Sequence, residues 1–402
     1  MKKFNISKEL LLNGMLIGVL SIGLASCGGG GGGGGGSTPT SPGGSGPSTP
    51  LSYSLATPIY AGTDYPNEPI IKVYIDGQPV KLVADTGNSG LTVNSSAVNI
   101  PSSAISSYTF SGPYGSITIS MASATVCLNP SIPNSCVVMS ISLNSGYYYP
   151  ATEEAQGDFG LASGLNSMNS GGGLTGYSYP TYLEMQYGMN SYTIGFYPLS
   201  NGYYSDVSST TPIGYISFGV YNGNSNTLIS YTMNPYLGMP STTVVFPSSN
   251  PSAPSFTSYA IFDTDFDYNF LSTSVFQTEI PNFSQTADEG ACASYTNNGS
   301  LYGAVNGGFV ISYSLLTNSG SSYIGSFTTE PSSSFCEANI PFTLMEGVTY
   351  DAGPRYPFEI FGLSAMLGHK FTFVLGTSGT NQGLVQDIGI KSLRRRRHHK
   401  HL

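Results

Sequence analysis

Short alternating runs of apolar and polar residues, separated by glycine- and proline-rich turns, follow one another along most of the chain. Residues 69–75 and 80–84 alternate in this way around a turn at Asp76-Gly77-Gln78, which predicts a β-hairpin. A second hairpin is expected over residues 108–121, with Gly-Pro-Tyr-Gly at its tip. The period of two residues predicts strands rather than helices.

The same pattern continues to the C-terminus. Further strands are predicted at 137–143, 191–196, 214–219, 242–246 and 259–268. One short helical segment is expected at 182–187, and Gly188 is placed to end it. A strand, a turn with a helix and another strand are expected over 358–374. The predicted fold class is therefore all-β with a few short helices.

The two ends of the chain differ in composition from the body. We assign residues 1–26 to a signal peptide, 27–50 to a glycine-, serine- and proline-rich tether and 394–402 to a basic tail. The tether, which contains nine consecutive glycines, cannot bury a core and is expected to be disordered. Between the ends we expect an N-terminal lobe at 51–235 and a C-terminal lobe at 236–393.

The leader has the layout of an export signal. Lys2 and Lys3 precede an apolar run that ends at Leu24-Ala25-Ser26-Cys27. This ending resembles a bacterial lipobox, which implies cleavage before Cys27 and lipidation of its thiol. The alternative is a soluble signal peptide followed by a chance cysteine. The small residue Gly28 after the cysteine favours an outer-membrane lipoprotein facing the periplasm or the cell surface.

Charge excludes one class of partner. The chain carries 13 Lys and Arg against 22 Asp and Glu. Eight of the basic residues and one acidic residue lie in the leader and the tail, so the body keeps 5 basic and 21 acidic residues. An acidic body of this kind is not expected to bind nucleic acid.

The cysteines fit an exported protein. Without Cys27 four remain, and this even number predicts two disulfides. Local pairing, Cys127 with Cys136 and Cys292 with Cys336, is the simplest of three possible arrangements. The body has a single histidine and no closely spaced cysteine pair, so we expect no metal site and no cofactor.

Two segments repeat at the scale of a lobe. An apolar strand ends on Asp85-Thr86 in the first half and on Asp263-Thr264 in the second. Each is followed by Phe-Gly-Leu, at 159–161 and 361–363, whose glycine lies 75 residues after the first aspartate and 99 residues after the second. Two such aspartates cannot both ionise when they are held close together, so the pair shares one proton. One then activates a water molecule while the other protonates a substrate carbonyl, without a nucleophilic side chain or metal.

These motifs resemble those of the pepsin-like aspartic peptidases, over roughly residues 55–390. The resemblance implies a bilobal fold with pseudo-twofold lobes, and Tyr114 looks like the tyrosine of the flap hairpin. It implies that Asp85 and Asp263 form the catalytic pair. The residues that look like the supporting active-site loops are Thr86, Gly87, Asn88, Ser89 and Thr264. The chain is most similar to an uncharacterised group of bacterial lipoproteins with a cysteine and polyglycine start.

The second motif departs from the family pattern. Asp265 stands where the family has glycine, and Phe266 stands where it has serine or threonine. We expect a Cβ at position 265 to be costly, because the backbone there packs close to the pair, and a third carboxylate to raise its pKa values. The alternation of Asp263, Asp265 and Asp267 also fits a solvated strand face or, less well, an oxygen-lined cation site.

The sequence thus predicts an exported aspartic-peptidase-like lipoprotein that hydrolyses an extended peptide or protein substrate. Its expected partners are that substrate and, through the lipid anchor, a membrane of the bacterial envelope; a monomer is expected. The alternative is a catalytically degenerate surface protein of the same fold that binds peptide or glycan. Whether the pair is active depends on Asp265 and Phe266.

Overall fold

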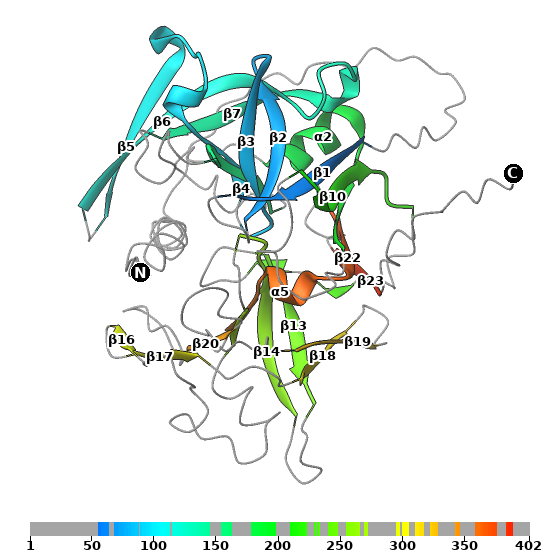
Figure 1. Cartoon of the computed structure of the whole chain (residues 1–402). Helices are drawn as coiled ribbons and strands as arrows, with labels where there is room; N and C mark the ends of the chain where they lie inside the picture. Colours follow the sequence, from blue (N-terminus) through cyan, green and yellow to red (C-terminus); the bar gives the residue numbers. More distant parts are fainter. Residues whose placement is uncertain are drawn as a thin grey trace, which may run out of the picture.

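The computed structural model is built from two β-sheets, one for each half of the molecule (Figure 1). It describes residues 55–63, 68–87, 89–112, 115–144, 154–162, 178–197, 210–222, 229–230, 232–233, 240–247, 255–265, 269–271, 295–297, 300–304, 310–316, 322–328, 342–345, 358–375 and 383–388. The tether, the basic tail and the predicted leader lie outside these residues. The strands and the two lobes confirm the predicted all-β bilobal fold.

The first sheet has 13 strands in the order β11-β23-β22-β9-β10-β1-β2-β3-β8-β4-β7-β6-β5. Their bounds are β1 Leu55–Ala61, β2 Pro69–Ile75, β3 Gln78–Asp85, β4 Ser89–Asn94, β5 Ile105–Gly112, β6 Gly115–Cys127, β7 Cys136–Asn144, β8 Gly157–Leu161, β9 Ser191–Phe196, β10 Pro212–Gly219, β11 Ile229–Ser230, β22 His369–Val374 and β23 Gly383–Ile388.

The second sheet has the order β16-β17-β20-β15-β21-β14-β13-β18-β19, and β12 pairs with β13 at its side. Its strands are β12 Thr232–Met233, β13 Pro240–Phe246, β14 Phe256–Phe262, β15 Asn269–Leu271, β16 Tyr295–Asn297, β17 Ser300–Ala304, β18 Val310–Leu316, β19 Ser322–Thr328, β20 Phe342–Met345 and β21 Phe358–Phe361. The described residues also include two α-helices, α2 Tyr179–Tyr187 and α5 Leu363–Met366.

Seven strands of each sheet follow the same plan. The order β2-β3-β8-β4-β7-β6-β5 in the first lobe corresponds to β13-β14-β21-β15-β20-β17-β16 in the second. The directions agree as well, because β8 runs parallel to β3 and antiparallel to β4, as β21 does to β14 and β15. This correspondence confirms the internal repeat that the Phe-Gly-Leu segments predicted. It places Asp85 and Asp263 at equivalent positions of two related lobes.

The predicted first hairpin is present. Strands β2 and β3 pair in antiparallel register from Ile75 opposite Gln78 to Ile70 opposite Val83. Asp76 has φ 47° and Gly77 has φ 80°, the left-handed conformations that a two-residue type I′ turn requires. The side chain of Asp76 also accepts a hydrogen bond of 2.8 Å from the N–H of Thr125 on β6. This turn fixes the register of β3 and therefore where its last residue lies.

The predicted helix is present and begins three residues earlier than expected. Helix α2 runs from Tyr179 to Tyr187, with a proline in its first turn, where the missing N–H has no helical partner to lose. Gly188 ends the helix with φ 70°, as expected, and its N–H donates to the carbonyl of Glu184 at 2.8 Å. The helix packs on β7, β8 and β9 and covers one face of the first sheet.

Sheet pairing crosses the predicted lobe boundary at residues 235 and 236. Strand β22 lies in the C-terminal part of the chain but pairs with β9 of the first sheet, from Lys370 opposite Gly195 to Val374 opposite Ser191. The hydroxyls of Thr193 and Thr372 on these strands lie 2.7 Å apart. The last described strands thus add to the sheet of the first lobe.

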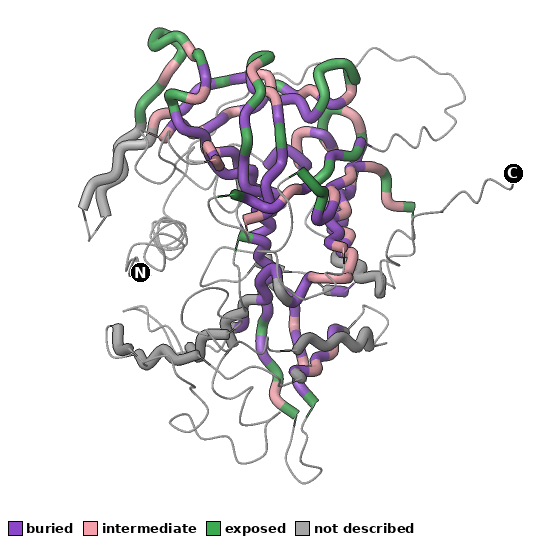
Figure 2. Tube along the Cα trace, in the orientation of Figure 1, coloured by how far each residue is buried: buried purple, intermediate pink, exposed green. Residues whose placement is uncertain are grey.

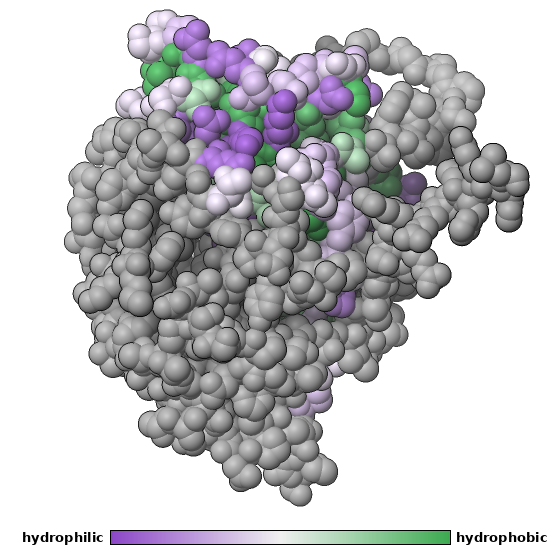
Figure 3. Space-filling view, in the orientation of Figure 1, coloured by the Kyte–Doolittle hydropathy of each residue, from purple (hydrophilic) through white to green (hydrophobic). Residues whose placement is uncertain are grey.

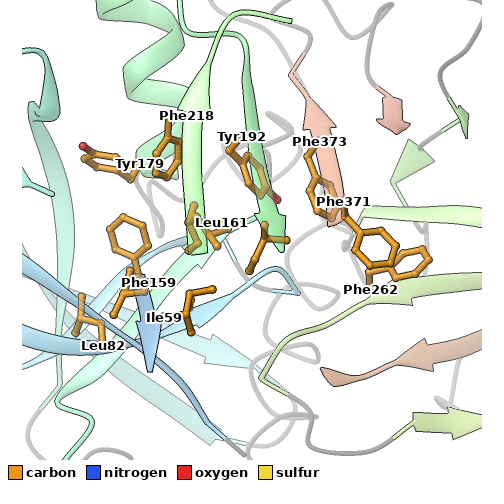
Figure 4. Packing of buried hydrophobic residues seen from close by; sticks show 14 of the residues in the cluster. Ile59, Leu82, Phe159, Leu161, Tyr179, Tyr192, Phe218, Phe262, Phe371 and Phe373 are labelled. Atoms are coloured by element: carbon orange, nitrogen blue, oxygen red, sulfur yellow. The ribbon is translucent and has the colours of Figure 1, made fainter. Parts of the chain in front are cut away.

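One hydrophobic core extends through both lobes (Figure 2). Aromatic rings link the lobes within it (Figure 4): Tyr192 on β9 stacks on Phe373 of β22 with centroids 4.8 Å apart. Phe371, also on β22, has its ring centroid 5.0 Å from that of Phe262, the last residue of β14. This packing holds the end of β14 firmly beside the first lobe.

The strand predicted at 259–268 is shorter than expected. Strand β14 ends at Phe262, and residues 263–265 form a turn, so Asp263 and Asp265 do not alternate on a strand face. That interpretation was wrong because the chain turns here: the N–H of Asp263 makes a last bond to β21, to the carbonyl of Phe361 at 2.9 Å, and the carboxyl of Asp263 then accepts the N–H of Asp265. Asp267 lies outside the described residues.

The described surface belongs mainly to the first lobe. In Figure 3 hydrophilic residues and smaller apolar areas lie side by side at the top of the view. No helix among the described residues is long and apolar enough to cross a membrane.

Candidate active site

Asp85 stands at the end of a buried strand. Strand β3 places Leu82, Val83 and Ala84 in the interior, and Asp85 itself is only 5% exposed. The N–H of Gly87 donates to Asp85 Oδ1 at 2.7 Å, so the turn after the strand holds the carboxyl in place. The hydrogen bond that this carboxyl accepts from the N–H favours its ionised form, while burial disfavours the same form.

Asp263 occupies the equivalent place in the second lobe. It follows β14 directly and is 3% exposed. The N–H of Asp265 donates to Asp263 Oδ1 at 3.1 Å, the same contact that Gly87 makes to Asp85. Both aspartates therefore sit in the same type of turn at the end of a strand.

Two threonines tie the turns together across the lobes. The N–H of Thr86 donates to Thr264 Oγ1 at 3.0 Å, and the N–H of Thr264 donates to Thr86 Oγ1 at 3.1 Å. The hydroxyl of Thr86 donates to the carbonyl of Phe262 at 2.7 Å, and the hydroxyl of Thr264 donates to the carbonyl of Ala84. Each buried threonine thus satisfies backbone groups of the opposite lobe, which fixes the two strand ends relative to one another.

The two carboxyl groups form a hydrogen bond to one another. Burial raises the pKa of Asp85 well above its usual range, and the charges of Asp263 and Asp265 raise it further. Burial and the charge of Asp265 raise the pKa of Asp263 to about 7. The pair therefore keeps one proton between its two carboxyls well above the pH at which an exposed aspartate ionises.

Such a pair can act as acid and base at once. The ionised member accepts a proton from water while the protonated member donates one to a carbonyl oxygen. Among the described residues, no group of three or more His, Cys, Asp or Glu side chains is arranged to hold a metal ion.

Gly87 and Asp265 hold equivalent positions but have different surroundings. A Cβ on Gly87 would lie 2.3 Å from Asp263 Oδ2, so only glycine fits there. Asp265 is exposed, and its φ is not in the left-handed region. The expectation that a Cβ at 265 is costly was therefore wrong, because the second turn leaves this side chain in solvent. The expected effect of its charge on the pair is confirmed.

The sequence interpretation missed Asp158. This carboxyl lies on β8, directly before the Phe-Gly-Leu segment of the first lobe, and is 4% exposed. Its charge contributes to the raised pKa of Asp263. A signal was present, since an acidic residue directly before Phe159-Gly160-Leu161 interrupts an otherwise apolar buried strand.

Several predicted residues have no described side chain. Asn88, Tyr114 and Phe266 lie outside the described residues, and only the backbone of Ser89 is described, as the first residue of β4. The hairpin predicted to carry Tyr114 is present as β5 and β6, which pair from Ile105 opposite Ala122 to Gly112 opposite Gly115. The roles of these four residues stay predictions.

The first predicted disulfide is present. Cys127 and Cys136 are bonded and join the end of β6 to the start of β7. Cys27, Cys292 and Cys336 lie outside the described residues, so lipidation and the second disulfide stay predictions.

Comparison with known proteins agrees with this arrangement. No family model matches the sequence, and no curated protein matches it. Among solved structures, the aspartic proteinase from Irpex lacteus is similar, with a TM-score of 0.51 over 83% of this chain and 97% of that one. The fold is pepsin-like.

The pepsin-like fold accounts for the bilobal plan and for the meeting of two equivalent strand ends. Sequence identity to the Irpex lacteus enzyme is 14%, so the likeness concerns the fold alone.

Proposed function

We propose that this chain is an exported lipoprotein that hydrolyses peptide bonds, with Asp85 and Asp263 activating a water molecule between them. One observation carries the proposal: two buried carboxyls from equivalent turns are hydrogen-bonded to one another and keep a proton toward neutral pH. The substrate is an extended peptide that lies where the lobes meet. Thr86, Gly87 and Thr264 hold the pair. The supporting roles expected for Asn88 and Ser89, and the flap role expected for Tyr114, belong to the same proposal.

The chemistry follows from the shared proton. The ionised carboxyl takes a proton from the attacking water, and the protonated carboxyl donates to the carbonyl oxygen of the scissile bond. When the tetrahedral intermediate breaks down, the carboxyl that took the proton of the water donates it to the amide nitrogen, and the other carboxyl accepts a proton from a hydroxyl of the intermediate. The C–N bond breaks, the amine leaves, and the pair again holds one proton. Neither a metal nor a covalent intermediate is required.

The test is cleavage of unfolded protein substrates by the purified chain from pH 3 to 7, with and without pepstatin. We expect pepstatin-sensitive turnover that Asp85→Ala lowers about 10²–10⁴-fold. Asp76→Asn, which keeps the acceptor for the N–H of Thr125 and tolerates the left-handed conformation, is the matched control and should leave turnover unchanged. Turnover that persists in Asp85→Ala would exclude the pair as the catalyst.

A second candidate is a catalytically degenerate protein that binds peptide or glycan at the same place. The observation that favours it is Asp265, which adds a third carboxylate beside the pair. If Asp265 impairs an otherwise intact site, Asp265→Gly should raise turnover or pepstatin affinity. Pepstatin binding without turnover in both forms would favour the binding protein.

Membrane attachment through Cys27 is a separate part of the proposal. It is supported by the apolar run that ends at Leu24-Ala25-Ser26-Cys27 and by the glycine-rich tether that follows. Radioactive palmitate should label the chain in a diderm bacterium, and the labelled chain should fractionate with the outer membrane. Cys27→Ser should abolish the label. Release of an unlabelled chain from the wild-type gene would favour the soluble signal peptide.

A further inference from the structure

Asp158 lies on the same face of the first sheet as the catalytic pair. Strand β8 lies between β3 and β4, and Asp158 is opposite Val83 on one side and Thr92 on the other. Two residues further along, Gly160 is opposite Asp85. Paired residues, and alternate residues of one strand, project from the same face of a sheet. The side chains of Asp158 and Asp85 therefore project from the same face.

Gly160 has no side chain, so β8 places no side chain between these two carboxyls. The diagonal from Asp158 to Asp85 spans one strand spacing and two residues, roughly 8 Å between Cα atoms. Asp158 is almost as buried as the pair itself, at 4% exposed against 5% for Asp85 and 3% for Asp263. A charge at this depth is poorly screened by solvent and acts over such a distance.

Few titratable groups lie on this face of the sheet among the described residues of β3, β4 and the turn after β14. Helix α2 covers the opposite face, where Tyr179 packs on Phe159 with ring centroids 5.2 Å apart. On the near face, β4 presents Gly90, Thr92 and Asn94, which do not titrate. The titratable groups that β3 and the turn after β14 contribute are Lys81, Asp85, Asp263 and Asp265.

Lys81 does not offset the charge of Asp158. Its ammonium Nζ lies 2.5 Å from Glu154 Oε1, and its side chain is half-exposed. The charges that raise the pKa of Asp263 come from two carboxyls, Asp265 in solvent and Asp158 in the interior. Of these two, Asp158 is the one that solvent does not screen.

We infer that Asp158 is a positioning residue of the active site, a third buried carboxyl that holds the shared proton on the Asp85–Asp263 pair toward neutral pH. The inference rests on the proposed function, because it assigns Asp158 a role in the same acid–base site. Asp158 does not contact the substrate in this account. It acts through Asp263 and so extends the pH range in which the pair holds one proton.

The test measures the pair directly, by carboxyl ¹³C NMR titration of the full chain labelled in its aspartates. Resonances are assigned with Asp85→Asn and Asp263→Asn. In Asp158→Asn, which keeps the shape and removes the charge, we expect the upper titration step of the pair to move to lower pH, by about a few tenths of a unit and without the salt dependence of an exposed charge. The basic limb of the kcat/KM profile should move with it.

Three further variants separate charge from structure. Asp158→Glu keeps a carboxyl and should keep the titration close to that of the wild type. Asp76→Asn makes the same chemical change at an exposed turn and should leave the upper titration step of the pair at its wild-type pH. Asp158→Ser provides a second neutral side chain if the amide variant does not fold.

The outcomes also separate this inference from the proposed function. An upper step that is unchanged in both Asp158→Asn and Asp158→Ser overturns the inference, even in an active enzyme. A step that moves in a chain without peptidase activity supports the inference and counts against the proposed function. A step that moves equally in Asp76→Asn reflects net charge alone and also overturns it.

Discussion

The turns after β3 and β14 have the same internal hydrogen bonds but different surroundings. In each, the N–H two residues beyond the aspartate donates to Oδ1, and the intervening threonine bonds to the opposite lobe. In the first turn Gly87 packs directly against the carboxyl of Asp263. In the second turn Asp265 occupies the equivalent place and is exposed to solvent.

The difference shows which parts of the site depend on symmetry. The threonine exchange and the paired carboxyls require both lobes to match, because each lobe supplies the partner of the other. Close packing around the pair requires a glycine on one side only. A second turn with a non-glycine residue therefore keeps the pair together and changes its electrostatics, since Asp265 adds a negative charge that raises the pKa of both aspartates.

The largest expected effect concerns stability against pH. Burial and neighbouring charge raise the pKa of Asp263 to about 7, so the folded chain binds a proton between pH 4 and 7 that the unfolded chain has released. The free energy of unfolding should therefore fall as pH rises through this window, by roughly 4 kcal/mol from this group. Urea unfolding of the wild type and of Asp263→Asn at several pH values measures it.

The variant and a control decide this prediction. Asp263→Asn should flatten the fall, because its amide does not titrate, and Asp76→Asn should keep it. If the wild type and Asp263→Asn lose stability equally between pH 4 and 7, the two lobes do not hold a titrating pair.

The threonine exchange should give the next largest effect. Thr86→Val and Thr264→Val each remove a hydroxyl that both donates and accepts, and leave buried backbone groups of the other lobe without their partner. We expect each to cost about 2–4 kcal/mol of unfolding free energy, nearly equal in the two lobes. Because the two residues share hydrogen bonds, the double variant should cost less than the sum.

Thr193→Val provides the control, because it breaks a single half-buried hydroxyl contact to Thr372 and should cost about 1 kcal/mol. If the losses of unfolding free energy in Thr86→Val and Thr264→Val add up in the double variant, the two turns are held independently. That result would contradict the hydrogen bonds between them.

Glycine requirements should differ between the lobes. In Gly87→Ala the new Cβ lies against Asp263 Oδ2, and relief requires the carboxyl or the turn to move, at about 1–3 kcal/mol. Asp265→Ala should change stability by less than about 0.5 kcal/mol, since this side chain is exposed. Thermal unfolding at pH 5 compares the two, and equal losses would contradict the difference in packing.

The smallest effect is expected from the charge of Asp265 alone. Asp265→Asn removes a carboxylate that raises the pKa of both aspartates, so the titration of the pair should move to lower pH. Solvent screens an exposed charge, and we expect a shift of about a few tenths of a pH unit, shrinking in high salt. A shift to higher pH, or one that salt does not reduce, would rule out this electrostatic account.

Local features were readable from the sequence because their causes are local. The Asp76-Gly77 turn, the end of α2 at Gly188 and the strand that delivers Asp85 each follow from the conformational preferences of a few neighbouring residues. The disulfide between Cys127 and Cys136 closes a loop of nine residues and was also predictable.

Long-range relations were not readable in the same way. The exchange between Thr86 and Thr264 joins residues 178 apart in the chain, and β22 pairs with β9 across a similar separation. The pattern of either strand is compatible with many partners. The role of Asp158 was missed for this reason, since its nearness to Asp85 depends on the register of β8 beside β3.

The sequence by itself determined that the chain forms strands, that two aspartates end buried strands, and that the two halves repeat. Periodicity and turn residues act within a few positions, so these features survive without knowledge of the fold. Only the tertiary structure decided that the two carboxyls bond to one another, that Asp265 lies in solvent while Gly87 packs on the pair, and that Asp158 shares their face. The physical reason is that desolvation and charge act through space, on groups that the chain brings together only when both lobes have folded.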